Sequence, residues 1–275
     1  FERRLLKEFR DLVATDLDRI VAAGDANRYR HVVGTGWKVA LGLTAAEILP
    51  ATETPEGQDV WRLSSPSDGA WMVKCVRAMP TDSPGKAAVT ITCISPNGGP
   101  PVRYAPALAG QAWDPAGAWV SADFQPLVGN PRLAAPYTYC YNLPLAARRA
   151  RQLAATLEWL ETRHSDAQVE VHGNGEAAGL AAAGVFSAVC AGSKRPARLR
   201  LVIDPAGFRF ASAVSIRAAH FLPASARFLD LPGLVGCLPL VTVVGGTDTA
   251  DFARFRHLSK ALGGRIQLDA SEDSR

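Results

Sequence analysis

The apolar positions near the start of the chain recur every three or four residues, and this spacing predicts an amphipathic helix over residues 2–22. Its apolar side chains are Leu5, Leu6, Phe9, Leu12, Val13, Leu17, Ile20 and Val21. Gly24 is expected to end this helix, because glycine is common just past a helix C-terminus. A second, short helix is predicted over residues 36–43. Residues 50–58 contain turn-forming residues and predict a linker.

Further along, short apolar runs separated by turn residues predict strands. These runs lie at 59–65, 70–78, 87–94 and 117–124. Helices are then predicted at 144–162, 176–191 and 249–262, and strands at 167–172, 198–203, 238–244 and 264–268, with a loop-rich stretch at 205–236. Strands that alternate with helices are typical of a mostly parallel sheet covered on both faces, and the earlier runs indicate an antiparallel start. The predicted class is α/β, with an N-terminal helical extension (1–50) and a main domain (51–275).

Composition and charge exclude several classes of partner. The chain has 275 residues and a net charge of only +4, and its one basic cluster, at 193–200, lacks interleaved aromatic residues, so we expect no nucleic-acid partner. None of the five cysteines has a Cys/His ligand spacing, so we expect no metal site and no cofactor. No apolar run approaches the ~18 residues of a membrane-spanning helix, so we expect no membrane partner. The first residue is Phe1, which predicts a piece of a longer polypeptide.

One strand-to-helix junction carries the strongest functional signal in the chain. A β-branched run ends at Gly173-Asn174-Gly175, and a helix rich in small residues follows directly. Glycines at such a junction give a tight turn and let the helix pack closely on the strand. His172 and Glu176 flank this turn and are candidates for a general-base pair, although a strand-end histidine is more often a satisfied structural residue.

The order of the predicted elements resembles the α/β-hydrolase fold, and more narrowly its bacterial acetylxylan-esterase-like branch. The similarity lies in the segments 29–43, 71–80, 141–161 and 201–213, and it covers most of residues 29–268. The resemblance implies an antiparallel start followed by parallel strands, with helices on both faces. It also implies descent from carboxylic ester hydrolases, and an extracytoplasmic location.

In that fold the nucleophilic serine stands at the centre of a G-x-S-x-G turn, which lifts its hydroxyl above the sheet. The matching residues here are Gly173-Asn174-Gly175-Glu176-Ala177. The small flanking residues of the motif are retained. The nucleophile position itself is Gly175, and a glycine has no side chain with which to attack a carbonyl carbon.

Two other parts of the hydrolase site also depart from the family pattern. Asp248 stands where the resemblance places the acid, although it also fits the start of a helix, and no histidine follows the last predicted strand. The oxyanion loop aligns with Asn97, Gly98 and Gly99 instead of the His-Gly typical of this branch. Three departures together predict a domain that has kept the scaffold and lost the chemistry, because loss of any triad member already removes most of the rate.

The leading interpretation is therefore a catalytically degenerate hydrolase-like domain with a structural, binding or assembly role. Its expected partners are another hydrolase domain of the same polypeptide or further copies of this chain, and carbohydrate is a candidate ligand. Exposed aromatic residues of 111–119 and 137–141 are candidates for sugar stacking, and core positions are the competing interpretation for the six tryptophans.

Two alternatives remain open from the sequence. The first is an active carbohydrate esterase with a non-standard site. The second is a nucleotide-binding domain, because Gly173, Gly175 and Gly179 resemble a dinucleotide-binding loop between a strand and a helix. Against the second, Glu176 in the first turn of the helix would repel a phosphate group.

Overall fold

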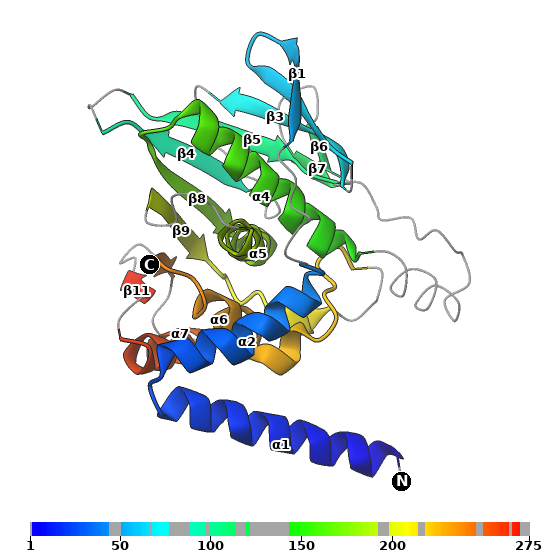
Figure 1. Cartoon of the computed structure of the whole chain (residues 1–275), viewed down its shortest axis with the longest axis vertical. Coiled ribbons are helices and arrows are strands. Elements are labelled where there is room, and N and C mark those ends of the chain that lie inside the picture. The colour runs from blue at the N-terminus through cyan, green and yellow to red at the C-terminus, as the bar shows by residue number, and fades with distance from the viewer. Residues whose placement is uncertain are drawn as a thin grey trace.

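The structure is a computed structural model, and Figure 1 shows it as a ribbon. It describes residues 2–43, 51–66, 68–76, 89–96, 100–109, 111–113, 119–121, 143–191, 198–213, 218–245, 250–263 and 266–269.

A nine-stranded mixed sheet forms the centre of the molecule, with the strand order β1-β2-β3-β5-β4-β8-β9-β10-β11. The strands are β1 (Thr52–Gly57), β2 (Val60–Ser65), β3 (Gly69–Val76), β4 (Thr90–Ile94), β5 (Val102–Ala107), β8 (Gln168–Asn174), β9 (Leu199–Asp204), β10 (Val241–Val244) and β11 (Ile266–Asp269). Neighbours from β1 to β8 pair antiparallel, and β8 to β11 pair parallel. The predicted α/β class, with an antiparallel start and a parallel C-terminal half, is confirmed. A separate hairpin joins β6 (Gln111–Trp113) and β7 (Trp119–Ser121).

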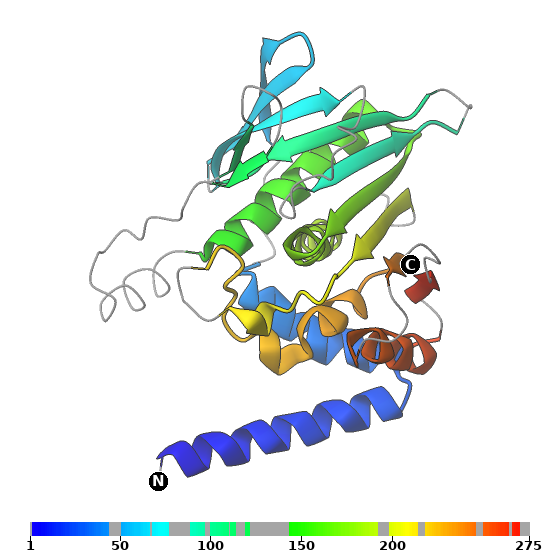
Figure 2. The ribbon, with the colours of Figure 1, turned by 180° about the vertical axis from the view of Figure 1, so that it is seen from behind.

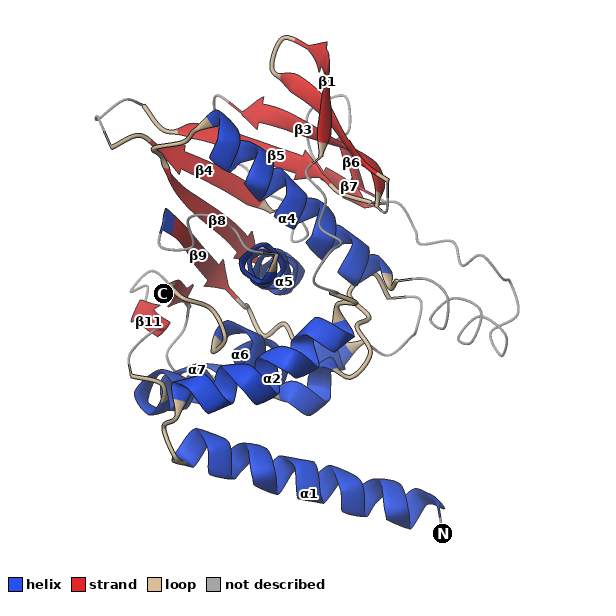
Figure 3. Ribbon diagram, in the orientation of Figure 1, coloured by secondary structure: helices blue, strands red, loops and turns tan. Residues whose placement is uncertain are grey.

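The described helices lie on one side of this sheet. They are α1 (Glu2–Ala22), α2 (Ala26–Ala40), α4 (Leu145–Arg163), α5 (Glu176–Cys190), α6 (Asp230–Val235) and α7 (Ala250–Ala261), with short 3-10 turns η2 (Phe210–Ser212) and η3 (Ser225–Phe228). Helices α4 and α5 pack against each other in front of the strands in Figure 1, and the strands lie in front of α4 in the reverse view of Figure 2. Helices α2, α6 and α7 group beside the β9–β11 end of the sheet, and α1 lies outside them (Figure 3).

The expectation of helices on both faces is met for one face only in the described part of the chain. The reason is topological: β8, β9, β10 and β11 follow one another in sequence and in space, so all three crossovers step toward the same edge. Crossovers between parallel strands are right-handed in nearly all proteins, and right-handed steps in one direction place every connecting helix on the same face.

The side chains of the strands divide the sheet into two chemically different faces. The face under the helices carries buried apolar residues: Trp71, Val73, Ile91, Cys93, Val169, Val171, Leu199, Leu201, Ile203, Val241, Val243 and Ile266. We call this the apolar face. The opposite face, which we call the polar face, carries Lys74, Thr90, Thr92, Arg103, Glu170, His172, Asn174, Arg200, Val202, Asp204, Thr242 and Val244.

The N-terminal region departs from the prediction at its second helix. Helix α1 has the predicted bounds, but α2 begins at Ala26 instead of residue 36, because the Asp25 carboxylate caps it by accepting hydrogen bonds from two backbone N–H groups. Tyr29 and Trp37 on α2 are fully buried, and the Tyr29 hydroxyl donates to the Gly233 carbonyl at 3.0 Å. Side chains of α2 therefore join the same apolar cluster as the sheet. The division into residues 1–50 and 51–275 stays a prediction.

The predicted linker at 50–58 is wrong, because these residues form the edge strand β1, which pairs with β2. Every residue of β1 is exposed, so no hydrophobic alternation marks it in the sequence. Strand β5 was also not predicted. It contains Pro106, which lowers the expectation of a strand inside a sheet, although Pro106 lies opposite Val73 in the register.

Polar side chains of α4 form hydrogen bonds and an ion pair with the loops that follow two of the antiparallel strands. The Gln152 side chain accepts from the backbone N–H of Ala109 at 2.7 Å, and the Arg149 Nε donates to the carbonyl of the same residue at 2.7 Å. Gln152 Nε2 also donates to the carbonyl of Asp68 at 2.8 Å. The Arg151 guanidinium forms a buried ion pair with the Asp68 carboxylate at 3.0 Å. The loops that follow β2 and β5 are thus held by one helix.

Candidate functional site

The predicted strand-to-helix turn is present at the end of β8. Gly175 lies between the last residue of β8 and the first residue of α5, with φ 58° and ψ −124°. This positive φ is a conformation that residues with a Cβ rarely adopt. The backbone N–H of Gly175 donates to the Asp204 carbonyl at 2.9 Å, which anchors the turn to β9. The junction is therefore a tight turn of the kind expected from the sequence, in a conformation that glycine adopts readily.

Two further glycines of this region are explained by close packing. A Cβ at Gly173 would lie 2.4 Å from the carbonyl oxygen of Ala177, so the strand and α5 approach too closely for any other residue. A Cβ at Gly179 would lie 2.3 Å from the ring of Phe208. The spacing that suggested a nucleotide-binding loop is thus accounted for by packing between the chain's own elements.

The expected pair of His172 and Glu176 is not formed, because each side chain binds a different partner. His172 Nε2 lies 3.5 Å from Glu170 Oε2 on the same strand, and Glu176 Oε1 lies 3.2 Å from His220 Nδ1. Residue 172 projects onto the polar face, whereas Glu176 begins α5 and faces the segment that holds His220. No role was predicted for His220, because it lies in the loop-rich stretch 205–236, where no periodic pattern marks it.

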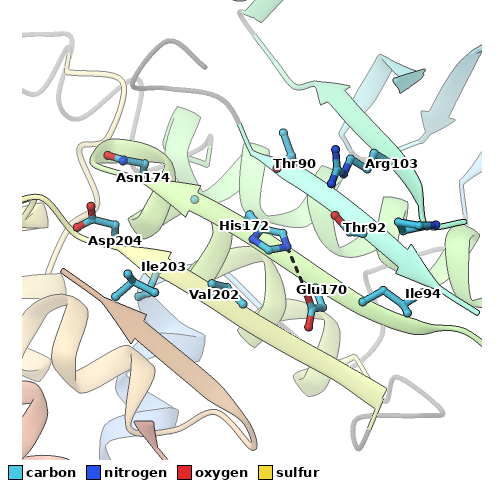
Figure 4. Close-up of a pocket in the computed structure, with 13 residues that line it drawn as sticks. Thr90, Thr92, Ile94, Arg103, Glu170, His172, Asn174, Val202, Ile203 and Asp204 are labelled. Atoms are coloured by element: carbon cyan, nitrogen blue, oxygen red, sulfur yellow. Dashed lines mark ion pairs between the residues drawn. The ribbon is translucent and has the colours of Figure 1, made fainter. Parts of the chain in front are cut away.

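A pocket of about 540 Å³ opens on the polar face beside the turn. Residues of β4, β5, β8, β9 and β10 line it, and His172, Gly173 and Asn174 are the residues of the predicted site among them (Figure 4). Its volume is in the range of about 300–1,000 Å³ typical of small-molecule sites. The described lining contains hydroxyl, amide, imidazole, carboxylate and guanidinium groups and no phenylalanine, tyrosine or tryptophan.

Charged and polar side chains of neighbouring strands form a network centred on Glu170, which lines the pocket. The Glu170 carboxylate lies 3.2 Å from Arg200 Nη1 and also faces His172, as the dashed line in Figure 4 shows. Arg200 donates through Nε and Nη2 to the Thr242 hydroxyl at 3.2 and 3.0 Å. Burial lowers the pKa of His172 below its ordinary value of 6.5. Glu170 opposes this effect, while Arg103 and Arg200 add to it. The ring is thus mainly neutral at pH 7.

Glu170 was missed as a site residue, although the sequence contains a signal for it. Glu170 and His172 alternate with Val169 and Val171 along β8, and such alternation is typical of a strand with one buried face and one polar face. Asp204 ends β9 and forms a turn, because its Oδ1 accepts from the backbone N–H of Ala206 at 3.0 Å.

A second, much smaller cavity of about 20 Å³ lies on the other side of the turn, between α4, α5 and His220. Arg149 Nη2 and His220 Nε2 are buried there, and neither has a hydrogen-bond partner in the part of the chain that the structure describes. Burial lowers the pKa of the Arg149 guanidinium to about 10, and the nearby Glu176 carboxylate acts in the opposite direction. The cavity has room for about one water molecule, so it is no site for a substrate.

Several predicted positions lie outside the described residues. These are Asp248 at the acid position, Asn97, Gly98 and Gly99 at the oxyanion-loop position, and the aromatic residues of 137–141. Of the tryptophans, Trp37, Trp71 and Trp159 are buried, and Trp61 packs against Trp159 with 5.5 Å between the ring centroids. For these four residues the core interpretation holds.

Within the described ranges, no group of three or more His, Cys, Asp and Glu side chains is placed to hold a metal ion. None of the helices among the described residues is both long enough and apolar enough to cross a membrane. Comparisons of the chain with protein-family models, with curated proteins and with solved structures give no match.

Proposed function

We propose that this chain is an α/β-hydrolase-like domain of acetylxylan-esterase-like descent that has lost its nucleophile and acts as a binding domain. The observation that carries the proposal is Gly175. It occupies the centre of a tight strand-to-helix turn, at the position that corresponds to the nucleophilic serine of that fold, and it offers an acyl group no side-chain atom.

The architecture around the turn supports this descent. The turn follows the first of four parallel strands, and antiparallel strands precede it, as in the proposed family. The glycine at 173 allows α5 to lie directly against the end of β8, which is the packing that the G-x-S-x-G motif serves. The pocket beside the turn supports a binding role, since it is large enough for a small ligand and rich in hydrogen-bonding groups.

The loss of acyl-transfer chemistry is tested by covalent labelling. We expect a fluorophosphonate probe to label no residue of the folded chain under conditions in which an active serine esterase is labelled completely. We also expect hydrolysis of an aryl acetate at a rate no higher than that of the unfolded chain. Stoichiometric labelling of any serine or threonine would contradict the proposal.

An active carbohydrate esterase with a non-standard site is the second candidate, and one observation favours it. His172 lines the pocket of about 540 Å³, and its Nε2 lies 3.5 Å from Glu170 Oε2, so a carboxylate orients an imidazole base in a cavity large enough for a substrate. Such a base would have to activate water in place of a serine. Turnover of an acetylated sugar between about pH 5 and pH 9, abolished in His172→Gln and retained in His31→Gln, would establish this function.

A further inference from the structure

Arg103 lies in the middle of the polar face and is a cation without a counter-ion among the described residues. It lies on β5, with three strands of the sheet on one side and five on the other, and it lines the pocket of about 540 Å³. Its side chain is half-buried, and its guanidinium forms no hydrogen bond or ion pair with any other described residue. An arginine at a sheet edge would simply be solvated, but this one stands in a concave site.

The neighbours of Arg103 on β4 supply hydroxyl groups, and the apolar Val76 lies directly opposite Arg103 on β3. Thr92 lies directly opposite Arg103 in the antiparallel register, and Thr90 is the next residue of β4 on the same face. Figure 4 shows both threonine side chains beside the guanidinium. Lys74 of β3 projects on the same face, diagonal to Arg103 and about 7–8 Å away between Cα atoms. The surroundings of Arg103 therefore combine positive charge with neutral hydrogen-bond donors.

The carboxylates of the same face are either engaged or distant. Glu170 is bound by both Arg200 and His172, on the far side of Thr92. Asp204 lies three strands away from Arg103, which is about 14 Å at the usual spacing of strands. The pocket thus has a positive end at Arg103 and a polar end at Asn174 and Asp204, whose side chains suit hydroxyl groups.

We propose that the pocket binds a small hydroxylated ligand through an anionic group, a carboxylate or a phosphate, seated on Arg103 between Thr90 and Thr92. This inference rests on the proposed binding role and names the chemistry of its ligand. Guanidinium forms paired, charge-assisted hydrogen bonds with both kinds of anion, and the threonine hydroxyls supply further donors. The hydroxyl groups of the ligand extend along His172 toward Asn174 and Asp204.

The test is a titration of the folded chain with glucuronate, glucose 6-phosphate and glucose at equal ionic strength, followed by calorimetry and by backbone amide NMR. We expect one of the two anionic sugars to bind and to shift the amide signals of β4 and β5, and glucose to bind more weakly by about tenfold or more. Arg103→Gln should weaken the anionic ligand to the level of glucose. The matched variant Arg62→Gln removes an exposed arginine of β2 outside the pocket and should bind as the wild type does.

The possible outcomes separate the two proposals. If glucose and the anionic sugars bind equally tightly, or if Arg103→Gln retains the preference with its fold intact by NMR, the anion site is wrong and the binding role stands. If none of the three molecules shifts any signal, both the anion site and the binding role fail. Which anion binds decides between carboxylate and phosphate.

Discussion

The two faces of the central sheet are built from the same strands and differ in almost every other respect. Under α4 and α5 the strands present valine, leucine, isoleucine and tryptophan side chains that are nearly all fully buried. On the reverse side they present threonine, arginine, glutamate, histidine and asparagine. The apolar side thus provides the core, and the binding site that we propose lies on the opposite side of the same sheet. The polar side is free to carry charges because it is not needed for the core.

The largest expected effect is on the free energy of unfolding, and it differs between variants of two adjacent residues of β9. Leu201 is fully buried on the apolar face, and Val202 is half-buried on the polar face. Leu201→Ala should lower the free energy of unfolding by about 2–5 kcal/mol, because it leaves a cavity in a packed core. Val202→Ala removes fewer buried atoms and should cost less than about 1 kcal/mol. Denaturant unfolding measures both, and equal losses would show that the polar face is also packed.

The next largest effect is also on the free energy of unfolding, and it is expected at Gly173, where β8 meets α5. Gly173→Ala places a Cβ 2.4 Å from a backbone oxygen that cannot move alone, so we expect a loss of about 1–3 kcal/mol. Asn174→Ala, at the following and exposed position, is the matched control and should change stability by no more than about 0.5 kcal/mol. A neutral Gly173→Ala variant would mean that α5 can shift away from the strand.

The sequence predicted the elements with strong periodicity and missed those without it. Helix α1, helix α4 and the strands from β8 onward follow clear apolar patterns and were placed within a few residues. The start of α2 depends on a side-chain cap at Asp25, and the exposed strand β1 depends on pairing with β2. Neither a cap nor strand pairing produces a hydrophobic pattern in the sequence. Local signals cannot show such contacts.

The candidate site was predicted only in the part that is continuous in the chain. The turn at 173–176 was found because its glycines are adjacent in sequence. Arg103, Arg200 and His220 come from distant segments, and only the register of the sheet or the fold of a loop brings them near β8. Alternation along β8 indicated a polar side, but not which residues of other strands would face it.

A smaller effect is expected on the pH dependence of stability through His172. Burial holds its folded-state pKa below 6.5, so the unfolded chain takes up the proton more readily. Its contribution to the free energy of unfolding is therefore present in full above about pH 6.5 and is lost as the pH falls toward the folded-state pKa. Titration of the ring by NMR should give a midpoint below 6.5. A midpoint above that value would place His172 in a more solvated or more negative site.

The smallest expected effects are opposite shifts of that same midpoint. Glu170→Gln removes the carboxylate that favours the charged ring and should lower the pKa of His172 further. Arg103→Gln removes a cation that opposes the charged ring and should raise the pKa of His172. Both are read from the same NMR titration. Shifts in the same direction would mean that the charges of the polar face do not act on the ring as the distances indicate.

The contacts of α4 also constrain the order in which the protein can be made. Arg149 and Gln152 hold Ala109 from 40 and 43 residues further along the chain, and Gln152 holds Asp68 across 84 residues. During synthesis the N-terminal strands leave the ribosome first, yet the helix that fastens them emerges later. The antiparallel half of the sheet therefore lacks these hydrogen bonds until translation has passed α4, and until then its apolar face has no helix to cover it.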